Sequence, residues 1–191
     1  MTDAEDPLAD AASIVPGLIV DLTYARPANV TGRALYPKEM KCWLRKSVAE
    51  RLARAARALA PLRLVAWDCT RTKEAHDTLW KAYPHPGSVA EPGRGSLHLR
   101  GVAIDLALAD PEGKLVDLPT AHDAFGPAAA ATAPLPDGPT KRHRDALIQA
   151  MHDAGFRVNP KEWWHFSRLY GWRWPVSRRL GDTIRNPVPT P

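Results

Sequence analysis

The chain has 191 residues, of which 45% are hydrophobic, and carries a formal net charge of +5. This length allows one domain with a buried core, and no run of about 20 apolar residues is present that would predict a membrane span. The basic residues are spread along predicted helices without interleaved aromatic residues, which argues against a nucleic-acid partner.

The first third of the chain predicts one long helix between two short strands. Residues 1–13 are acidic and alanine-rich, and we expect them to be disordered or weakly helical, whereas the apolar residues 18–22 predict a short strand. Residues 45–60 predict a helix, because apolar side chains recur there at helical spacing. This apolar face consists of Val48, Leu52, Ala55, Ala56 and Leu59. The apolar run at residues 62–67 predicts a buried strand.

The middle of the chain predicts a second helix and a hairpin. Residues 73–83 are predicted to be helical, and a Pro- and Gly-rich loop follows over residues 84–95. Residues 102–108 are apolar except for one aspartate and predict a strand. Residues 110–113 predict a turn, and residues 114–118 are predicted to form a neighbouring strand after it, which completes a hairpin.

The last third predicts a helix, an aromatic strand and a tail. We expect the Ala/Pro-rich residues 126–139 to form a mobile surface loop, and apolar spacing over residues 146–154 predicts a helix that Gly155 ends. Residues 175–191 are rich in proline and arginine, and we expect a flexible tail. The chain is therefore predicted to be a single α+β domain over residues 14–174.

Two histidines and one aspartate are candidate metal ligands. Catalytic zinc takes three protein ligands and leaves a fourth position for water, whose pKa falls to about 7. His98, Asp105 and His165 provide such a set. Asp105 lies in an apolar strand and His165 lies among aromatic residues, and burying either side chain is costly unless it has a partner. One metal ion would stabilise both.

Glu162 is the candidate general base, because a carboxylate near the water can take its proton and pass it to a departing amine. A regular strand, however, turns residues three apart toward opposite faces. If Glu162 and His165 act at one metal, the backbone must bend between them or Glu162 must lie at the start of the strand.

The pattern Ser96-x-His98-x-x-Gly101-x-Ala103-x-Asp105, followed by Glu162-x-x-His165, resembles the VanX-type D-alanyl-D-alanine dipeptidases. Further segments are similar to family segments in the same order, over roughly residues 15–170. These segments are residues 21–25, 29–32, 67–71 and 118–125. The combination is far more specific than any one motif.

The resemblance implies a hedgehog/DD-peptidase-like fold with a small antiparallel sheet flanked by helices, and one Zn²⁺ per subunit. It implies a small D,D-dipeptide substrate and a role in cell-wall turnover or glycopeptide tolerance, with a water on zinc as the nucleophile. Arg71 would polarise the scissile carbonyl and stabilise the oxyanion. Ser96 and Tyr24 would position the substrate, and Asp123 would receive its free amino group.

Other interpretations of these residues stay open. Arg71 could be a solvated surface cation, Tyr24 a core aromatic residue, and Asp123 a helix N-cap. Thr70 and Thr72 replace the Tyr and Pro that flank the family's arginine, so the pocket wall there differs. The alternative functions are a D,D- or L,D-carboxypeptidase acting on longer peptidoglycan peptides, and a non-catalytic zinc-containing binding domain.

The remaining histidines and the cysteines carry weaker expectations. We interpret four histidines as solvated, namely His76, His85, His143 and His152. His122 is expected at the surface, or else at the pocket mouth. Cys42 and Cys69 are either two thiols or one disulfide, depending on the redox compartment. The N-terminus as written lacks a secretory signal, which predicts a cytoplasmic protein, or a periplasmic one if a signal was removed.

Overall fold

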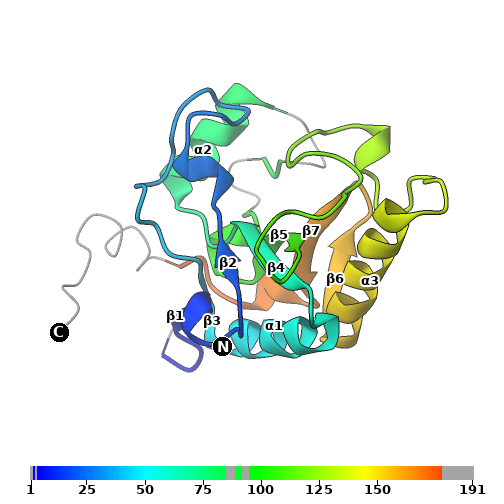
Figure 1. Ribbon diagram of the computed structural model, residues 1–191. Coiled ribbons are helices and arrows are strands. Elements are labelled where there is room, and N and C mark those ends of the chain that lie inside the picture. The colour runs from blue at the N-terminus through cyan, green and yellow to red at the C-terminus, as the bar shows by residue number, and fades with distance from the viewer. Residues whose placement is uncertain (1, 3, 85–88, 92–94, 178–191) are drawn as a thin grey trace.

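The computed structural model describes residues 2, 4–84, 89–91 and 95–177, and it has the expected α+β architecture (Figure 1). A five-stranded sheet has the order β2-β4-β5-β7-β6. Its strands are β2 (Ile19–Val20), β4 (Arg63–Asp68), β5 (Ala103–Ala109), β6 (Phe156–Asn159) and β7 (Glu162–Arg168). Only β2 and β4 pair in parallel among these strands, so the sheet is mixed rather than wholly antiparallel.

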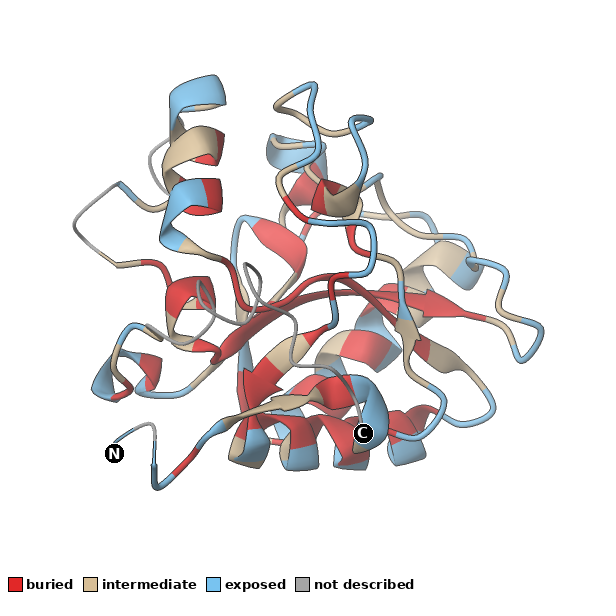
Figure 2. Cartoon of the chain, turned by 90° about the vertical axis from the view of Figure 1, so that its left-hand side faces the viewer, coloured by how far each residue is buried: buried red, intermediate tan, exposed pale blue. Residues whose placement is uncertain are grey.

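Helices lie on both sides of the sheet. α1 (Lys46–Leu59) and α3 (Pro139–Asp153) contact each other and pack along one side, whereas α2 (Lys73–Ala82) lies on the other side (Figures 1 and 2). α1 confirms the predicted helix, because all five residues of its predicted apolar face are buried. None of the described helices has the length and apolar character needed to cross a bilayer.

The two central strands are the most completely buried elements. Every residue of β5 is buried, and β4 is buried from Leu64 onward. The predicted hairpin after β5 is reduced to a single bridge between Ala109 and Leu115. A charged side chain on β5 is therefore held inside the protein, at a place where it needs partners.

The segment expected to be disordered or weakly helical, residues 1–13, contains a strand and a 3₁₀ turn in its described part. Leu8–Asp10 forms strand β1, which pairs with β3 (Trp43–Arg45). The buried Asp6 accepts hydrogen bonds from the backbone N–H and hydroxyl of Ser47 and from the indole of Trp174. Asp6 thus caps α1 from a distant segment, since Arg45 at the N-cap position makes no side-chain cap.

Two further segments are more ordered than expected. Within residues 126–139, Ala129, Ala131 and Ala133 are buried, and the carbonyl of Ala133 accepts a hydrogen bond from Arg144. The segment therefore lies only partly at the surface, whereas a surface loop was expected. Of the predicted tail, Pro175 accepts a hydrogen bond from Arg45, whereas residues 178–191 lie outside the described part.

The two cysteines form a disulfide. Cys42, just before β3, is bonded to Cys69, which follows β4 directly. Next to this bridge, the backbone N–H and the hydroxyl of Thr70 both bond the carbonyl of Trp43. The disulfide and these hydrogen bonds therefore both hold the segment that leads to Arg71 against β3.

Candidate active site

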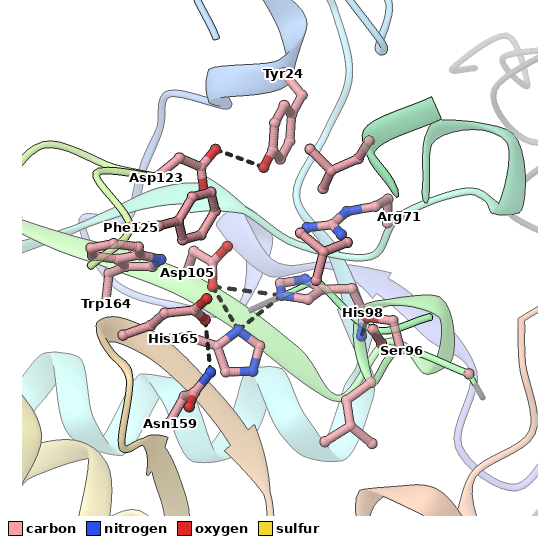
Figure 3. A pocket seen from close by; sticks show the side chains of 16 residues that line it. Tyr24, Arg71, Ser96, His98, Asp105, Asp123, Phe125, Asn159, Trp164 and His165 are labelled. Carbon is pink, nitrogen blue, oxygen red and sulfur yellow. Dashed lines mark hydrogen bonds and ion pairs between the residues drawn. The ribbon is translucent and has the colours of Figure 1, made fainter. Parts of the chain in front are cut away.

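Three side chains converge as the sequence predicts. One ligand atom from each of His98, Asp105 and His165 lies within 4.8 Å of the others. Asp105 and His165 are register partners on the antiparallel strands β5 and β7, so their side chains lie on the same face of the sheet. The Nδ1 atom of His165 is 2.9 Å from Oδ1 of Asp105. Figure 3 shows the three residues around one point.

His98 reaches the same point from a short 3₁₀ turn, His98–Arg100, that precedes β5. Its Nδ1 lies 2.6 Å from the carbonyl oxygen of Cys69. Because a carbonyl only accepts, Nδ1 carries the hydrogen and the lone pair of Nε2 faces the cluster. Nε2 is 3.2 Å from Nδ1 of His165 and 3.5 Å from Oδ1 of Asp105. Two imidazole nitrogens and a carboxylate oxygen around one point can hold a metal ion.

Glu162 lies at the start of β7, which is one of the two arrangements that the sequence allowed. The pairing of β6 with β7 shifts register between Val158 and Asn159, where Asn159 pairs with Glu162. The amide of Asn159 donates to Oε2 of Glu162 over 2.8 Å. This irregularity allows Glu162 to line the same cavity as His165, although the two residues are three positions apart.

Arg71 is buried, not solvated, and follows β4 in the same cavity wall. Its Nη2 donates to Oδ2 of Asp68 over 2.6 Å, and Nε donates to the same oxygen. The hydroxyl of Tyr36 donates to the other oxygen, Oδ1. Burial acts to lower the pKa of Arg71, but Asp68 and the smaller contributions of Tyr24, Tyr36 and Asp105 together outweigh it, and the pKa lies well above its usual range. The guanidinium is therefore a fixed positive charge.

Tyr24 and Asp123 form the opposite wall of the cavity (Figure 3). The hydroxyl of Tyr24 donates to Oδ2 of Asp123 over 2.7 Å. Burial, and then the charge of Asp123, raises the pKa of Tyr24 well above its usual range, so this hydroxyl stays a donor. Asp123 lies in a turn with φ of 57°, so the helix N-cap interpretation is wrong.

The cavity that these residues line has a volume of about 260 Å³. This is below the ~300–1,000 Å³ of pockets for drug-sized ligands. Ser96 lies in its wall, and its hydroxyl accepts a hydrogen bond from the backbone N–H of His98. All eight predicted site residues line this one cavity, which suits a small polar ligand.

Comparison with known proteins shows which family this chain is similar to. The chain matches the family of D-ala-D-ala dipeptidases over residues 4–171. The chain belongs to the D-Ala-D-Ala dipeptidase family. It is 36% identical over 168 residues to the D-alanyl-D-alanine dipeptidase of Escherichia coli (strain K12), covering 87% of this chain and 86% of the relative. It is 32% identical over 97 residues to the D-alanyl-D-alanine dipeptidase of a Synechocystis strain, covering 44% of this chain and 39% of that relative.

Membership of this dipeptidase family confirms the resemblance found in the sequence and the peptidase class with it. The family is one of metallopeptidases, and the cluster of His98, Asp105 and His165 could bind a metal. The match also includes the N-terminal segment from residue 4, in agreement with the ordered β1 strand.

The sequence interpretation of this dipeptidase-family chain assigned no role to three polar residues near the site. Asp68 is fully buried beneath Arg71, Asn159 bonds Glu162, and the His122 side chain is only 5% exposed, against the expected surface position. Asp68 directly follows an apolar strand, which was a usable signal for a buried carboxylate. His122 lies in a turn and Asn159 is the last residue of the short strand β6, where spacing gives no such signal.

The prediction that His76 is solvated is also wrong, because this side chain is 1% exposed. It lies on the buried face of α2 with Ala75 and Leu79, at helical spacing that could have revealed it. Nη1 of Arg71 lies 3.5 Å from its Nδ1. Burial, followed by the charge of Arg71, lowers the pKa of His76 to about 4. Of the other three histidines, His152 is exposed, His143 is partly exposed, and His85 lies outside the described residues.

This low pKa predicts a loss of stability in mild acid. The unfolded chain protonates His76 near pH 6.5 and the folded chain near pH 4, so the unfolded state binds more protons between these values. The free energy of unfolding is expected to fall as the pH is lowered through this window, by on the order of 2 kcal/mol at pH 4.5. Urea unfolding of wild type and His76→Gln at pH 7 and pH 4.5 measures the contribution. Equal pH dependence in the two proteins would contradict it.

Proposed function

We propose that this chain is a zinc-dependent dipeptidase that hydrolyses D-alanyl-D-alanine or a close D,D-dipeptide. The observation that carries the proposal is the content of one small cavity: a metal-ligand cluster, two further carboxylates and a buried guanidinium. The family match and the printed names of the two relatives support the same substrate class. Removal of such a dipeptide would connect the enzyme to cell-wall turnover or to glycopeptide tolerance.

The residues present fit a zinc ion. Two imidazole nitrogens and one carboxylate oxygen form a donor set that zinc prefers, and three protein ligands are typical of its catalytic sites. Zinc held by His98, Asp105 and His165 would polarise the scissile carbonyl and lower the pKa of a coordinated water to about 7. The bond from His98 to the carbonyl of Cys69 fixes the ring tautomer that such binding requires.

Glu162 is proposed to move the proton. It takes a proton from the attacking water as the new C–O bond forms, and it returns that proton to the nitrogen as the C–N bond breaks. The hydrogen bond from Asn159 to Oε2 holds the carboxylate in place. Its place at the start of β7, in the lining of the same cavity as the cluster, supports this role.

Arg71 is proposed to stabilise the oxyanion of the tetrahedral intermediate. Its Nε and Nη2 hydrogens are directed to Asp68, which fixes the plane of the guanidinium beside the cavity. A preoriented charge in a buried site stabilises a developing negative charge more than a mobile one does. Asp68 therefore acts as the group that positions Arg71.

Asp123 is proposed to receive the free ammonium group of the substrate, with Tyr24 and Ser96 as positioning groups. The metal cluster already contains its own carboxylate, so Asp123 is available to a cationic part of the ligand. Burial raises the pKa of Asp123, although the neighbouring His122 and the Tyr24 hydroxyl oppose this effect. An ammonium group placed here would offset the cost of burying the carboxylate. This arrangement favours a dipeptide over a longer peptide.

The proposal is tested with the zinc-loaded protein and three substrates: D-Ala-D-Ala, L-Ala-L-Ala and a pentapeptide that ends in D-Ala-D-Ala. Release of alanine is measured before chelation, after chelation and after zinc is restored. We expect release from the D,D-dipeptide alone, loss on chelation and recovery with zinc. Release from the pentapeptide would instead indicate a carboxypeptidase. No release from any substrate, with zinc bound, would support a non-catalytic binding domain.

A further inference from the structure

We propose that His122 is a positioning residue that orients the metal ligand Asp105. The two oxygens of Asp105 have different partners. Oδ1 faces the cluster, 2.9 Å from Nδ1 of His165, whereas Oδ2 is 3.2 Å from Nε2 of His122. The inference rests on the proposed metal site and goes beyond its ligand set.

The contact with Asp105 requires a hydrogen on Nε2 of His122. A carboxylate oxygen only accepts, so Nε2 donates to Asp105. Nδ1 lies 2.8 Å from the hydroxyl oxygen of Thr23, and this hydroxyl can donate to the ring. A relay therefore runs from Thr23 through His122 to Oδ2 of Asp105, and it leaves Oδ1 for the metal.

Two tryptophan rings hold the ring of His122 in a fixed orientation toward Asp105. It stacks on Trp67, with ring centroids 5.2 Å apart and planes 29° apart, and it meets Trp164 edge-on with centroids 5.7 Å apart. Its side chain is only 5% exposed. His122 does not belong to the cavity lining, so it acts on Asp105 from behind and not on the substrate.

His122 also lies between the two carboxylates of the site. Its Nε2 is 3.6 Å from Oδ1 of Asp123, which belongs to the next residue, and 3.2 Å from Oδ2 of Asp105. Two buried carboxylates close together repel each other, and a donor between them reduces that repulsion. His122 thus orients the carboxylate of Asp105, the proposed metal ligand. It also separates this carboxylate from that of Asp123 in the opposite wall.

The test compares zinc affinity in the wild-type protein and three variants by competition with a chromogenic chelator. His122→Phe keeps an aromatic ring between Trp67 and Trp164 but removes the donor, and we expect zinc to bind about 10–100-fold more weakly. His122→Gln retains an N–H donor and is expected to recover most of that loss. His152→Phe makes the same substitution at an exposed position of α3 and is expected to bind zinc as wild type does.

A second measurement separates positioning from a general structural effect. Cobalt(II) is substituted for zinc, and its visible absorption reports the ligand arrangement. We expect an altered spectrum for His122→Phe and a spectrum close to wild type for His122→Gln, with circular dichroism unchanged in both. Wild-type affinity and spectrum in His122→Phe would overturn the inference. Absence of zinc binding by the wild-type protein would instead overturn the proposed metal site.

Discussion

Replacement of Glu162 by glutamine is expected to lower kcat for D-Ala-D-Ala by about 10²–10⁴-fold, the range that a positioned general base contributes. Glutamine has nearly the same shape but cannot accept the proton, and its carbonyl can still accept the hydrogen bond from Asn159. Zinc content should therefore remain that of the wild-type protein. Steady-state kinetics and metal analysis on the same preparation measure both quantities.

The control for this variant is Glu112→Gln, which makes the same change at an exposed turn. It is expected to leave kcat and zinc content unchanged. Loss of zinc in Glu162→Gln would show that Glu162 is a ligand and not a base. A kcat within a few-fold of wild type would assign the proton transfer to another group.

Replacement of Arg71 by methionine is expected to lower kcat by about 10²–10³-fold, as loss of an oxyanion donor does in other enzymes. It should also destabilise the fold by about 3–5 kcal/mol, because Asp68 is left as an uncompensated buried charge. Kinetics at a temperature where the variant is folded, together with urea unfolding, measure the two effects.

A double variant separates catalysis from stability. In Arg71→Met combined with Asp68→Asn, no buried charge remains at this pair, and asparagine can still accept the hydrogen bond from Tyr36. We expect stability to recover while kcat stays low. Arg57→Met, at an exposed position of α1, is the matched control for loss of an arginine. Recovery of kcat together with stability would contradict a catalytic role for Arg71.

The regular elements of this chain could be predicted because their signals are local. Apolar residues at helical spacing identify α1, and an apolar run interrupted only by Asp105 identifies β5. The three candidate metal ligands could be named because burial of Asp105 and His165 needs a compensating partner. For these parts of the molecule, residue type and spacing carry the information.

Other parts depend on contacts between distant segments. Asp6 lies in an acidic, alanine-rich segment that resembles a disordered end, and it is ordered by Ser47 and Trp174. His122 was expected at the surface or else at the pocket mouth, and nothing near it in the sequence indicates its contacts with Trp67 and Asp105. A single sequence gives no local signal for such partners. The register shift near Asn159 also has no local signal in the sequence, because it depends on how two strands pair.

That register shift has a consequence for how this fold can change over evolution. Asp105 and His165 are aligned by the pairing of β5 with β7, whereas Glu162 reaches the cavity through the irregular pairing of β6 with β7. A change in the pairing of β6 with β7 alone would move Glu162, whereas the pairing of β5 with β7 would still align Asp105 with His165. In evolution, the position of the proposed base could therefore change independently of the alignment of the candidate metal ligands.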